Sequence, residues 1–199
     1  MKKYLLIMLG LIILLPVKGW AGEPTAQLKK SVDAVIEILN DLELEKPANK
    51  AARRAGIRRL VEVRFNFEEM AKRALAQHWR KLAPAQQQEF IGLFTELIEY
   101  TYISKVERYE DEEVVYLDED TRGPRATVRT EIVGRQGGNN IPVHYRLLEE
   151  HGAWRVYDVV IENVSLVSNY RTQFNSLLRT GPYEKLAASL RAKVAGLKQ

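Results

Sequence analysis

The sequence contains no cysteine and only three histidines among its 199 residues. Without cysteine the chain forms no disulfide, so its fold depends on burying an apolar core. The histidines, His78, His144 and His151, do not stand at metal-ligand spacing with one another or with an acidic pair. We therefore expect no metal site, and we interpret His144 and His151 as solvated surface residues.

The sequence also lacks the short motifs of common enzymes. It has neither a Gly-x-Ser-x-Gly elbow nor a glycine loop that opens a helix and could bind phosphate. The glycine cluster Gly137-Gly138 joins two strand-like segments instead, and the pair Glu68-Glu69 lies in a polar stretch. These absences argue against an enzyme, and we expect no catalytic residue and no cofactor.

The first residues have the pattern of a secretory signal peptide. A basic start is followed by an apolar run of 12 residues, Tyr4–Leu15, and then by the small residues Gly19 and Ala21. A membrane-spanning helix needs roughly 20 apolar residues, so the run is too short for an anchor. The pattern predicts a signal peptide over residues 1–21, cleaved after Ala21, and a single domain over residues 22–199.

The charge of the chain changes with this cleavage. Removing the segment takes away three lysines and no acidic residue, so the formal net charge falls from +4 to +1. A value so close to zero excludes a strong overall field that would steer charged partners. Nucleic acid is an unexpected partner for an exported chain.

Periodicity predicts an α+β fold in which an antiparallel sheet stands between two groups of helices. Helices are predicted over 25–44, 48–63, from an N-cap at Asn66, from Pro84 onward, over 165–178 and over 183–197. Four strands are predicted over 114–117, 125–133, 141–147 and 154–161, the middle pair joined by a hairpin turn at 137–140. Helices are expected to cover one side of the sheet.

One acidic residue falls within an apolar strand. Alternation predicts that Asp158 shares a face with Trp154, Val156 and Val160. A buried carboxylate needs a partner, and Arg171 in the following helix is our candidate. The alternative is that this face is open to water at Asp158.

Large apolar and aromatic side chains are spread over the helices and strands. A filled core and a ligand cavity produce the same periodicity, so the pattern leaves both readings open.

Four strings carry a resemblance to a known family. They are FNFEEMA at 65–71, HWRKL at 78–82, F-x-x-L-F-x-x-L at 90–97 and WRVYDVVIENVSLVSNYR-x-x-F at 154–174. In this order they resemble the MlaC-like periplasmic phospholipid-binding proteins, also known as the toluene-tolerance family. The likeness covers nearly all of the chain from about residue 25, and its last string is the most specific.

The resemblance implies a function that composition alone does not. It implies helices and an antiparallel sheet around an apolar cavity that holds the acyl chains of a glycerophospholipid. The implied protein is a soluble periplasmic carrier without enzymatic activity, metal or cofactor. Its implied partners are an inner-membrane MCE-domain protein of an ABC transporter complex and an outer-membrane lipoprotein complex.

Inward-facing periodicity, combined with the resemblance, predicts twelve lipid-binding residues. They are Phe94, Leu97, Val128, Ile132, Val143, Tyr145, Val156, Val160, Leu166, Val167, Tyr170 and Phe174.

Three alternatives remain at this point. One is a hopanoid-associated carrier of the same family, whose pocket would suit a rigid polycyclic ligand. The second is a small enzyme on a cone-shaped α+β scaffold, with Asp158 as its base. The third is an interaction module with a filled core and no bound lipid.

Overall fold

The computed structural model describes residues 23–109, 112–134 and 140–198. The predicted signal peptide lies outside the described residues, and so does most of the predicted turn at 137–140.

The described chain is a succession of helices, strands and again helices. The first helical elements are α1 (Glu23–Leu39), α2 (Leu42–Glu45), η1 (Pro47–Asn49), α3 (Lys50–Arg64), α4 (Phe67–Leu75), η2 (Ala76–Lys81) and α5 (Pro84–Val106). The strands are β1 (Glu113–Arg122), β2 (Arg125–Val133), β3 (Ile141–Glu150), β4 (Ala153–Ile161) and β5 (Val164–Ser165). The chain closes with α6 (Leu166–Thr180) and α7 (Tyr183–Leu197).

The sheet is antiparallel throughout, and its strands lie in chain order from β1 to β5. This confirms the predicted α+β class and the meander. The sheet has five strands where four were predicted, because β5 is a two-residue strand that pairs with the end of β4. A two-residue strand leaves no periodic signal in a sequence.

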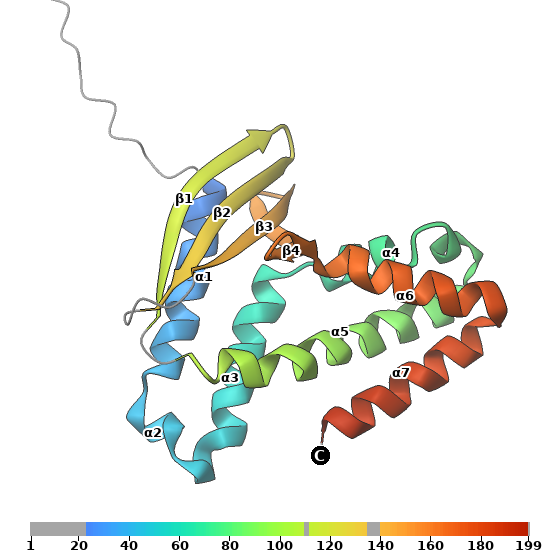
Figure 1. The fold of residues 1–199 in the computed structure, drawn as a ribbon, viewed down its shortest axis with the longest axis horizontal. Coiled ribbons are helices and arrows are strands. Elements are labelled where there is room, and N and C mark those ends of the chain that lie inside the picture. The colour runs from blue at the N-terminus through green and yellow to red at the C-terminus, as the bar shows by residue number, and fades with distance from the viewer. Residues whose placement is uncertain (1–22, 110–111, 135–139, 199) are drawn as a thin grey trace, which may run out of the picture.

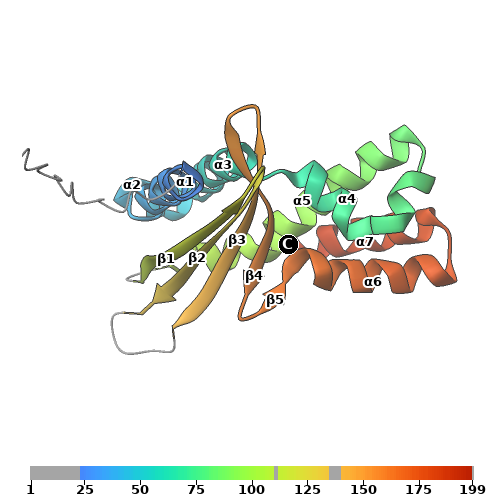
Figure 2. The ribbon, with the colours of Figure 1, turned by 90° about the horizontal axis from the view of Figure 1, so that it is seen from above.

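The helices divide into two groups around the sheet. Figure 2 shows α1 and α3 along one side of the sheet, and α4, α6 and α7 beyond its β4–β5 edge. In Figure 1, α5 runs below the sheet and links the two groups. None of the helices in the described part of the chain combines the length and apolarity that a membrane crossing requires.

Local chemistry explains two departures from the predicted elements. The helix predicted over 25–44 is divided, because Asp41 starts a new helix by accepting hydrogen bonds from the backbone of Glu43 and Leu44. Strand β1 extends to Arg122 rather than Leu117. Its second half is charged, as is common in an edge strand, and so lacks the apolar alternation that marks a strand.

The N-cap predicted at Asn66 is confirmed. Its side-chain oxygen accepts a hydrogen bond from the backbone N–H of Glu69 at 2.8 Å. The backbone N–H of Asn66 donates to the carbonyl of Val156 on β4 at 2.8 Å. The capping residue of α4 therefore also fixes this helix to the sheet.

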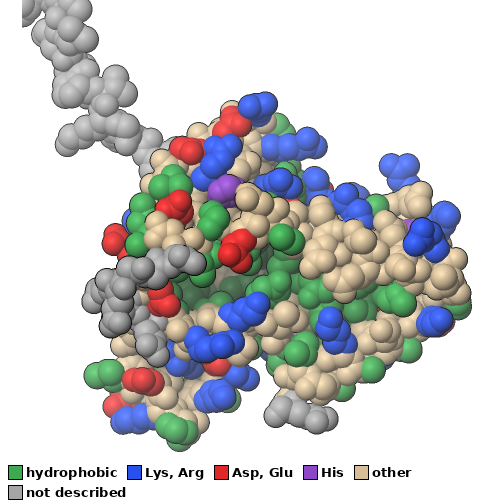
Figure 3. Space-filling model, in the orientation of Figure 1, with side chains coloured by type: hydrophobic (Ala, Val, Ile, Leu, Met, Phe, Trp, Pro, Cys, Tyr) green, Lys and Arg blue, Asp and Glu red, His purple; other side chains and the backbone are tan. Residues whose placement is uncertain are grey.

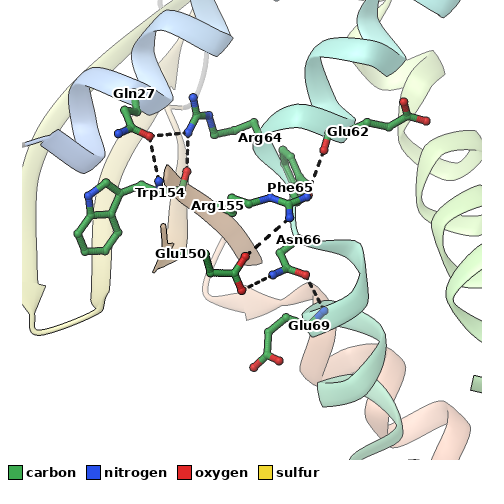
Figure 4. A network of polar contacts seen from close by, with 9 residues as sticks. All are labelled: Gln27, Glu62, Arg64, Phe65, Asn66, Glu69, Glu150, Trp154 and Arg155. Carbon is green, nitrogen blue, oxygen red and sulfur yellow. Dashed lines mark hydrogen bonds and ion pairs between the residues drawn. The ribbon is translucent and has the colours of Figure 1, made fainter. Parts of the chain in front are cut away.

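Arg64, two residues before Asn66, connects three parts of the fold (Figure 4). Its guanidinium donates to Ser31 Oγ at 2.8 Å and to Gln27 Oε1 at 3.0 Å, both on α1, and to the carbonyl of Trp154 on β4. Gln27 Oε1 also accepts from the backbone N–H of Trp154 at 2.9 Å. Burial, followed by the charge of Arg155, lowers the pKa of Arg64.

A second set of contacts fixes the β3–β4 hairpin to the same junction (Figure 4). Asn66 Nδ2 donates to Glu150 Oε1 at 2.7 Å, and Arg155 Nη2 donates to the carbonyl of Phe65 at 2.7 Å. Residues 64–66, which we call the α3–α4 junction, thus hold α1, β4 and the hairpin in register.

Replacing Arg64 by Lys tests this junction. Lysine keeps the positive charge but cannot reach three partners as a planar fork can. We expect Arg64→Lys to lower the free energy of unfolding by about 2 kcal/mol, because buried acceptors lose their donor. Urea denaturation measures the change. Arg59→Lys on the exposed side of α3 is the matched control and should change stability by less than about 0.5 kcal/mol. Equal effects of the two variants would contradict this role of Arg64.

Candidate functional site

The apolar interior consists of two clusters. The helical cluster is formed by α4, α5, α6 and α7 around Phe94, and the sheet cluster by β2, β3 and β4 with Leu28 of α1. Phe65 packs against both. The α3–α4 junction therefore contains the side chain at which the two clusters meet.

A hollow with hydrophobic side chains at its floor opens on the face shown in Figure 3. In the same orientation, Figure 1 shows the sheet above this place and α5 below it, with α1 and α3 further back. We call the face of the sheet that carries the sheet cluster its inner face. The side chains on this face are more deeply buried at one end of the strands than at the other. Ala126, Leu147 and Trp154, at the end where α1 begins, are buried, whereas Ile132 and Ile161 toward the other end keep exposed surface.

The candidate contact residues for a ligand on this face are the apolar side chains that pack against the sheet cluster without being fully covered. They are Val32, Phe65, Tyr116, Ile132, Tyr145 and Ile161.

The structure places half of the twelve predicted lipid-binding residues in the helical cluster. These are Phe94, Leu97, Leu166, Val167, Tyr170 and Phe174. The ring of Phe94 meets Tyr170 edge-on at 5.4 Å and Phe174 at 5.8 Å between centroids. Such interlocking rings are typical of a packed core. Lipid contact by these six residues stays a prediction.

The other half lies on the sheet. Val128, Val143 and Val156 are buried in the sheet cluster, and Ile132 and Tyr145 are the two that remain partly exposed beside it. Val160 pairs with His144 and Ser165, and it points to the opposite face from Val159 and Ile161. The structure thus leaves Ile132 and Tyr145 partly exposed on the face of the sheet cluster and places Val160 on the opposite face.

The predicted surroundings of Asp158 were wrong. A β-bulge interrupts the β3–β4 ladder, so that Arg146 pairs with Asp158 and the next residue of β3 pairs with Val156. The extra residue reverses the side on which Asp158 points, away from Trp154 and Val156. Strict alternation could not anticipate this shift.

The partner predicted for Asp158 was also wrong. Its carboxylate accepts from Ser165 Oγ at 2.7 Å, from the backbone N–H of Val167 at 3.1 Å and from Arg146 at 3.1 Å. Arg171 donates instead to the carbonyl of Arg73. Asp158 is 3% exposed, and it stabilises the N-terminus of α6, where unpaired N–H groups favour a negative charge. This is a structural arrangement rather than that of a general base.

Four of these candidate contact residues are not among the twelve predicted ones: Val32, Phe65, Tyr116 and Ile161. Val32 lies on the predicted inner stripe of α1, so periodicity could have found it. Ile161 lies beyond the β4 bulge, so strict alternation placed it on the opposite face. Tyr116 belongs to the one stretch of β1 that was recognised as a strand. Phe65 carries no local signal, because its position depends on the turn between α3 and α4.

Ion pairs fix α5, below the hollow, against α3. Arg54 and Glu107 form a two-pronged contact at 2.7 Å, and this hydrogen bond holds the pKa of the Glu107 carboxyl below its usual value. One turn further along α3, Arg58 Nε lies 3.0 Å from Glu99 Oε2 on α5. There burial is the larger influence, and it raises the pKa of Glu99.

Two polar pockets lie elsewhere on the surface. One, of about 510 Å³, lies between α3 and α5 and has four glutamates and Arg58 in its wall. The other, of about 460 Å³, lies beside the α3–α4 junction. None of the twelve predicted residues lines either pocket. Among the described residues there is no group of three or more histidines and carboxylates that could hold a metal ion.

Comparison with known proteins gives the family. The profile of the family described as MlaC protein matches residues 29–192, most of the chain. The chain belongs to the MlaC family. This confirms the resemblance carried by the four sequence strings.

Two individual relatives agree with this assignment. The curated "Intermembrane phospholipid transport system binding protein MlaC" of Haemophilus influenzae is 24% identical over 108 residues, which are 52% of this chain and 50% of that protein. The chain thus spans about half the length of this curated relative. A solved phospholipid-binding protein of Ralstonia solanacearum, in complex with a phospholipid, has a TM-score of 0.75 at 23% identity. The match covers 87% of this chain and 98% of that one, and it shows that the two proteins share a fold.

Replacing Asp158 by Ala tests the structural role assigned to it. The change leaves the N–H of Val167 and the hydroxyl of Ser165 without their acceptor, and we expect a loss of about 3 kcal/mol in the free energy of unfolding. Arg146→Ala is the comparison. The Arg146 side chain is 45% exposed, so its loss should cost less than about 1 kcal/mol. Thermal and urea unfolding measure both. A loss from Arg146→Ala as large as that from Asp158→Ala would show that the ion pair, rather than the helix cap, is the main interaction.

Proposed function

We propose that this MlaC-family protein is a periplasmic carrier that holds the acyl chains of a glycerophospholipid between the inner face of the sheet and α5. The observation that carries the proposal is the apolar hollow (Figure 3), beside which Ile132, Tyr145 and Ile161 keep exposed surface. Membership in the MlaC family and the phospholipid in the solved Ralstonia relative support the choice of ligand.

The energetics of lipid transfer require such a site. Burial of one CH₂ group is worth about 0.8 kcal/mol, so exposing a chain of about 16 carbons to water costs roughly 12 kcal/mol on the same scale. An apolar surface that the protein leaves partly uncovered replaces the membrane interior for such a chain. The carrier needs no catalytic group, because transfer is a physical exchange.

The same proposal covers the processing and the partners of the chain. Residues 1–21 act as a signal peptide that is removed after Ala21, and residues 22–199 form one lipid-binding domain. The carrier exchanges lipid with an inner-membrane MCE-domain protein of an ABC transporter complex and with an outer-membrane lipoprotein complex. Family membership and the transport system in the name of the Haemophilus relative support these partners.

Mass spectrometry of the protein purified from periplasm without detergent tests the proposal. We expect an intact mass that starts at Gly22 and an organic extract with about one glycerophospholipid per chain. A hopanoid in the extract would assign the cargo to a polycyclic lipid. An extract without lipid, from a folded monodisperse protein, would contradict the carrier function.

Filling the hollow should remove the lipid. We expect Ile132→Trp combined with Ile161→Trp to reduce co-purified phospholipid to about a tenth, which corresponds to ~1.4 kcal/mol of binding free energy. Leu117→Trp is the matched control, because Leu117 is 51% exposed at the bulge of β1, and its lipid content should not change. Circular dichroism checks that all variants are folded. Full lipid content in the double variant would contradict the proposed position of the acyl chains.

A further inference from the structure

Two tyrosine side chains on the inner face of the sheet have hydroxyl groups that make no hydrogen bond to the described residues. Tyr116 on β1 pairs with Thr130 of β2, and Tyr145 on β3 pairs with Val128 of β2. Thr130 and Val128 are two residues apart on β2, so they point to the same side of the sheet. Paired residues point to the same side of a sheet, so both rings lie on the side of the sheet cluster, against which both pack. Within the described part of the chain, the hydroxyl of Tyr116 has no hydrogen-bond partner and is shielded from water. Tyr145 is only partly buried, and its hydroxyl makes no hydrogen bond to the described residues.

The situation of Tyr116 is unusual for a tyrosine whose hydroxyl is buried. Buried hydroxyl groups nearly always find a partner, and one without a partner calls for an explanation such as a missing ligand. Tyr183 shows the ordinary case, since its hydroxyl contacts the carbonyl of Gln86 at 3.0 Å and Glu89 at 3.1 Å. The two sheet tyrosines therefore offer donors that the protein itself does not use.

Both groups are neutral donors rather than ionised acceptors. Burial raises the pKa of Tyr145 to about 12. Burial also raises the pKa of Tyr116, with smaller contributions from Tyr145 and Asp33. The two phenols consequently keep their protons throughout the physiological pH range.

The surroundings restrict what these donors can bind. A charged phosphate would need a cation beside it, and Lys29, which lies 5.8 Å above the Tyr116 ring, is already paired with Asp33 at 2.8 Å. A neutral acceptor attached to apolar chains fits better. The acyl ester of a glycerophospholipid is such a group, because its carbonyl oxygen accepts hydrogen bonds and it joins each chain to the glycerol.

We propose that Tyr116 and Tyr145 donate hydrogen bonds to the acyl ester carbonyl oxygens of the bound phospholipid. This proposal rests on the carrier function proposed above. It makes the protein selective for ester-linked chains over hydrocarbon chains of the same length, because only the ester satisfies the two donors. A site that hydrogen-bonds a ligand group discriminates against analogues that lack this group.

A choice between ester and ether lipids tests this selectivity. The protein, stripped of co-purified lipid, is incubated with vesicles of equal parts dioleoyl phosphatidylcholine and its dioleyl ether analogue. Both have the same headgroup and chains, but the ether lipid lacks the carbonyl groups. Mass spectrometry of the re-isolated protein measures the ratio bound. We expect about a tenfold preference for the ester lipid from two modest hydrogen bonds.

Three variants show whether the preference for the ester lipid comes from the two hydroxyl groups or from any change of a tyrosine on the sheet. Tyr116→Phe and Tyr145→Phe remove only a hydroxyl, and together they should bring the ester-to-ether ratio to about one while uptake of the ether lipid persists. Tyr157→Phe is the control. Tyr157 is the extra residue of the β4 bulge and lies under the guanidinium of Arg73 at 4.1 Å, against the helical cluster, so its variant should keep the tenfold preference.

The outcomes distinguish the two proposals. Uptake of both lipids in equal amounts by the unaltered protein would overturn the hydrogen bonds and leave the carrier function intact. A preference for the ester that persists in the double variant would do the same. Uptake of neither lipid would contradict the carrier function, and the selectivity would fall with it.

Discussion

The attachment of the α3–α4 junction to β4 is the constraint on which the rest of the structure depends. Arg64 bonds to α1 and to the carbonyl of Trp154, Phe65 packs against both hydrophobic clusters, and Asn66 caps α4 while it donates to Val156 and Glu150. Three consecutive residues thus fix the helices and the sheet relative to each other. Two further links join the clusters: α6 begins directly after β5, and ion pairs hold α5 against α3.

The two clusters have different physical characters, and the proposed function follows from this difference. The helical cluster is closed by interlocking rings around Phe94 and forms a conventional core. The sheet cluster is covered by α1 at one end and keeps exposed apolar surface at the other, together with the buried hydroxyl of Tyr116, which has no partner among the described residues, and the partly buried Tyr145. Such a surface is unfavourable in water. A phospholipid supplies both the apolar chains and the acceptors that would complete it.

Periodicity predicted those parts of the fold whose residues are close in sequence. The stripe around Phe94 in α5 and the alternation along β2 gave helices, strands and the α+β class. The bulge opposite Arg146 could not be read in this way, because one extra residue reverses every side chain beyond it, and so Asp158 and Val160 were placed on the wrong face. The predicted inward orientation of Ile132 and Tyr145 is not affected by this irregularity, and their contact with lipid stays a prediction. The role of Phe65 depends on contacts with residues about 90 positions away, which no local pattern contains.

The central claim is that the acyl chains lie between the inner face of the sheet and α5. Photo-crosslinking with a phospholipid that carries a diazirine near the middle of one acyl chain tests it most directly, since mass spectrometry then identifies the labelled peptides. The account predicts labels on the inner-face residues of β2 and β3, from Val128 to Tyr145, and on α5. Labels confined to α6 and α7, or to the polar pocket at Glu62 and Glu99, would contradict it.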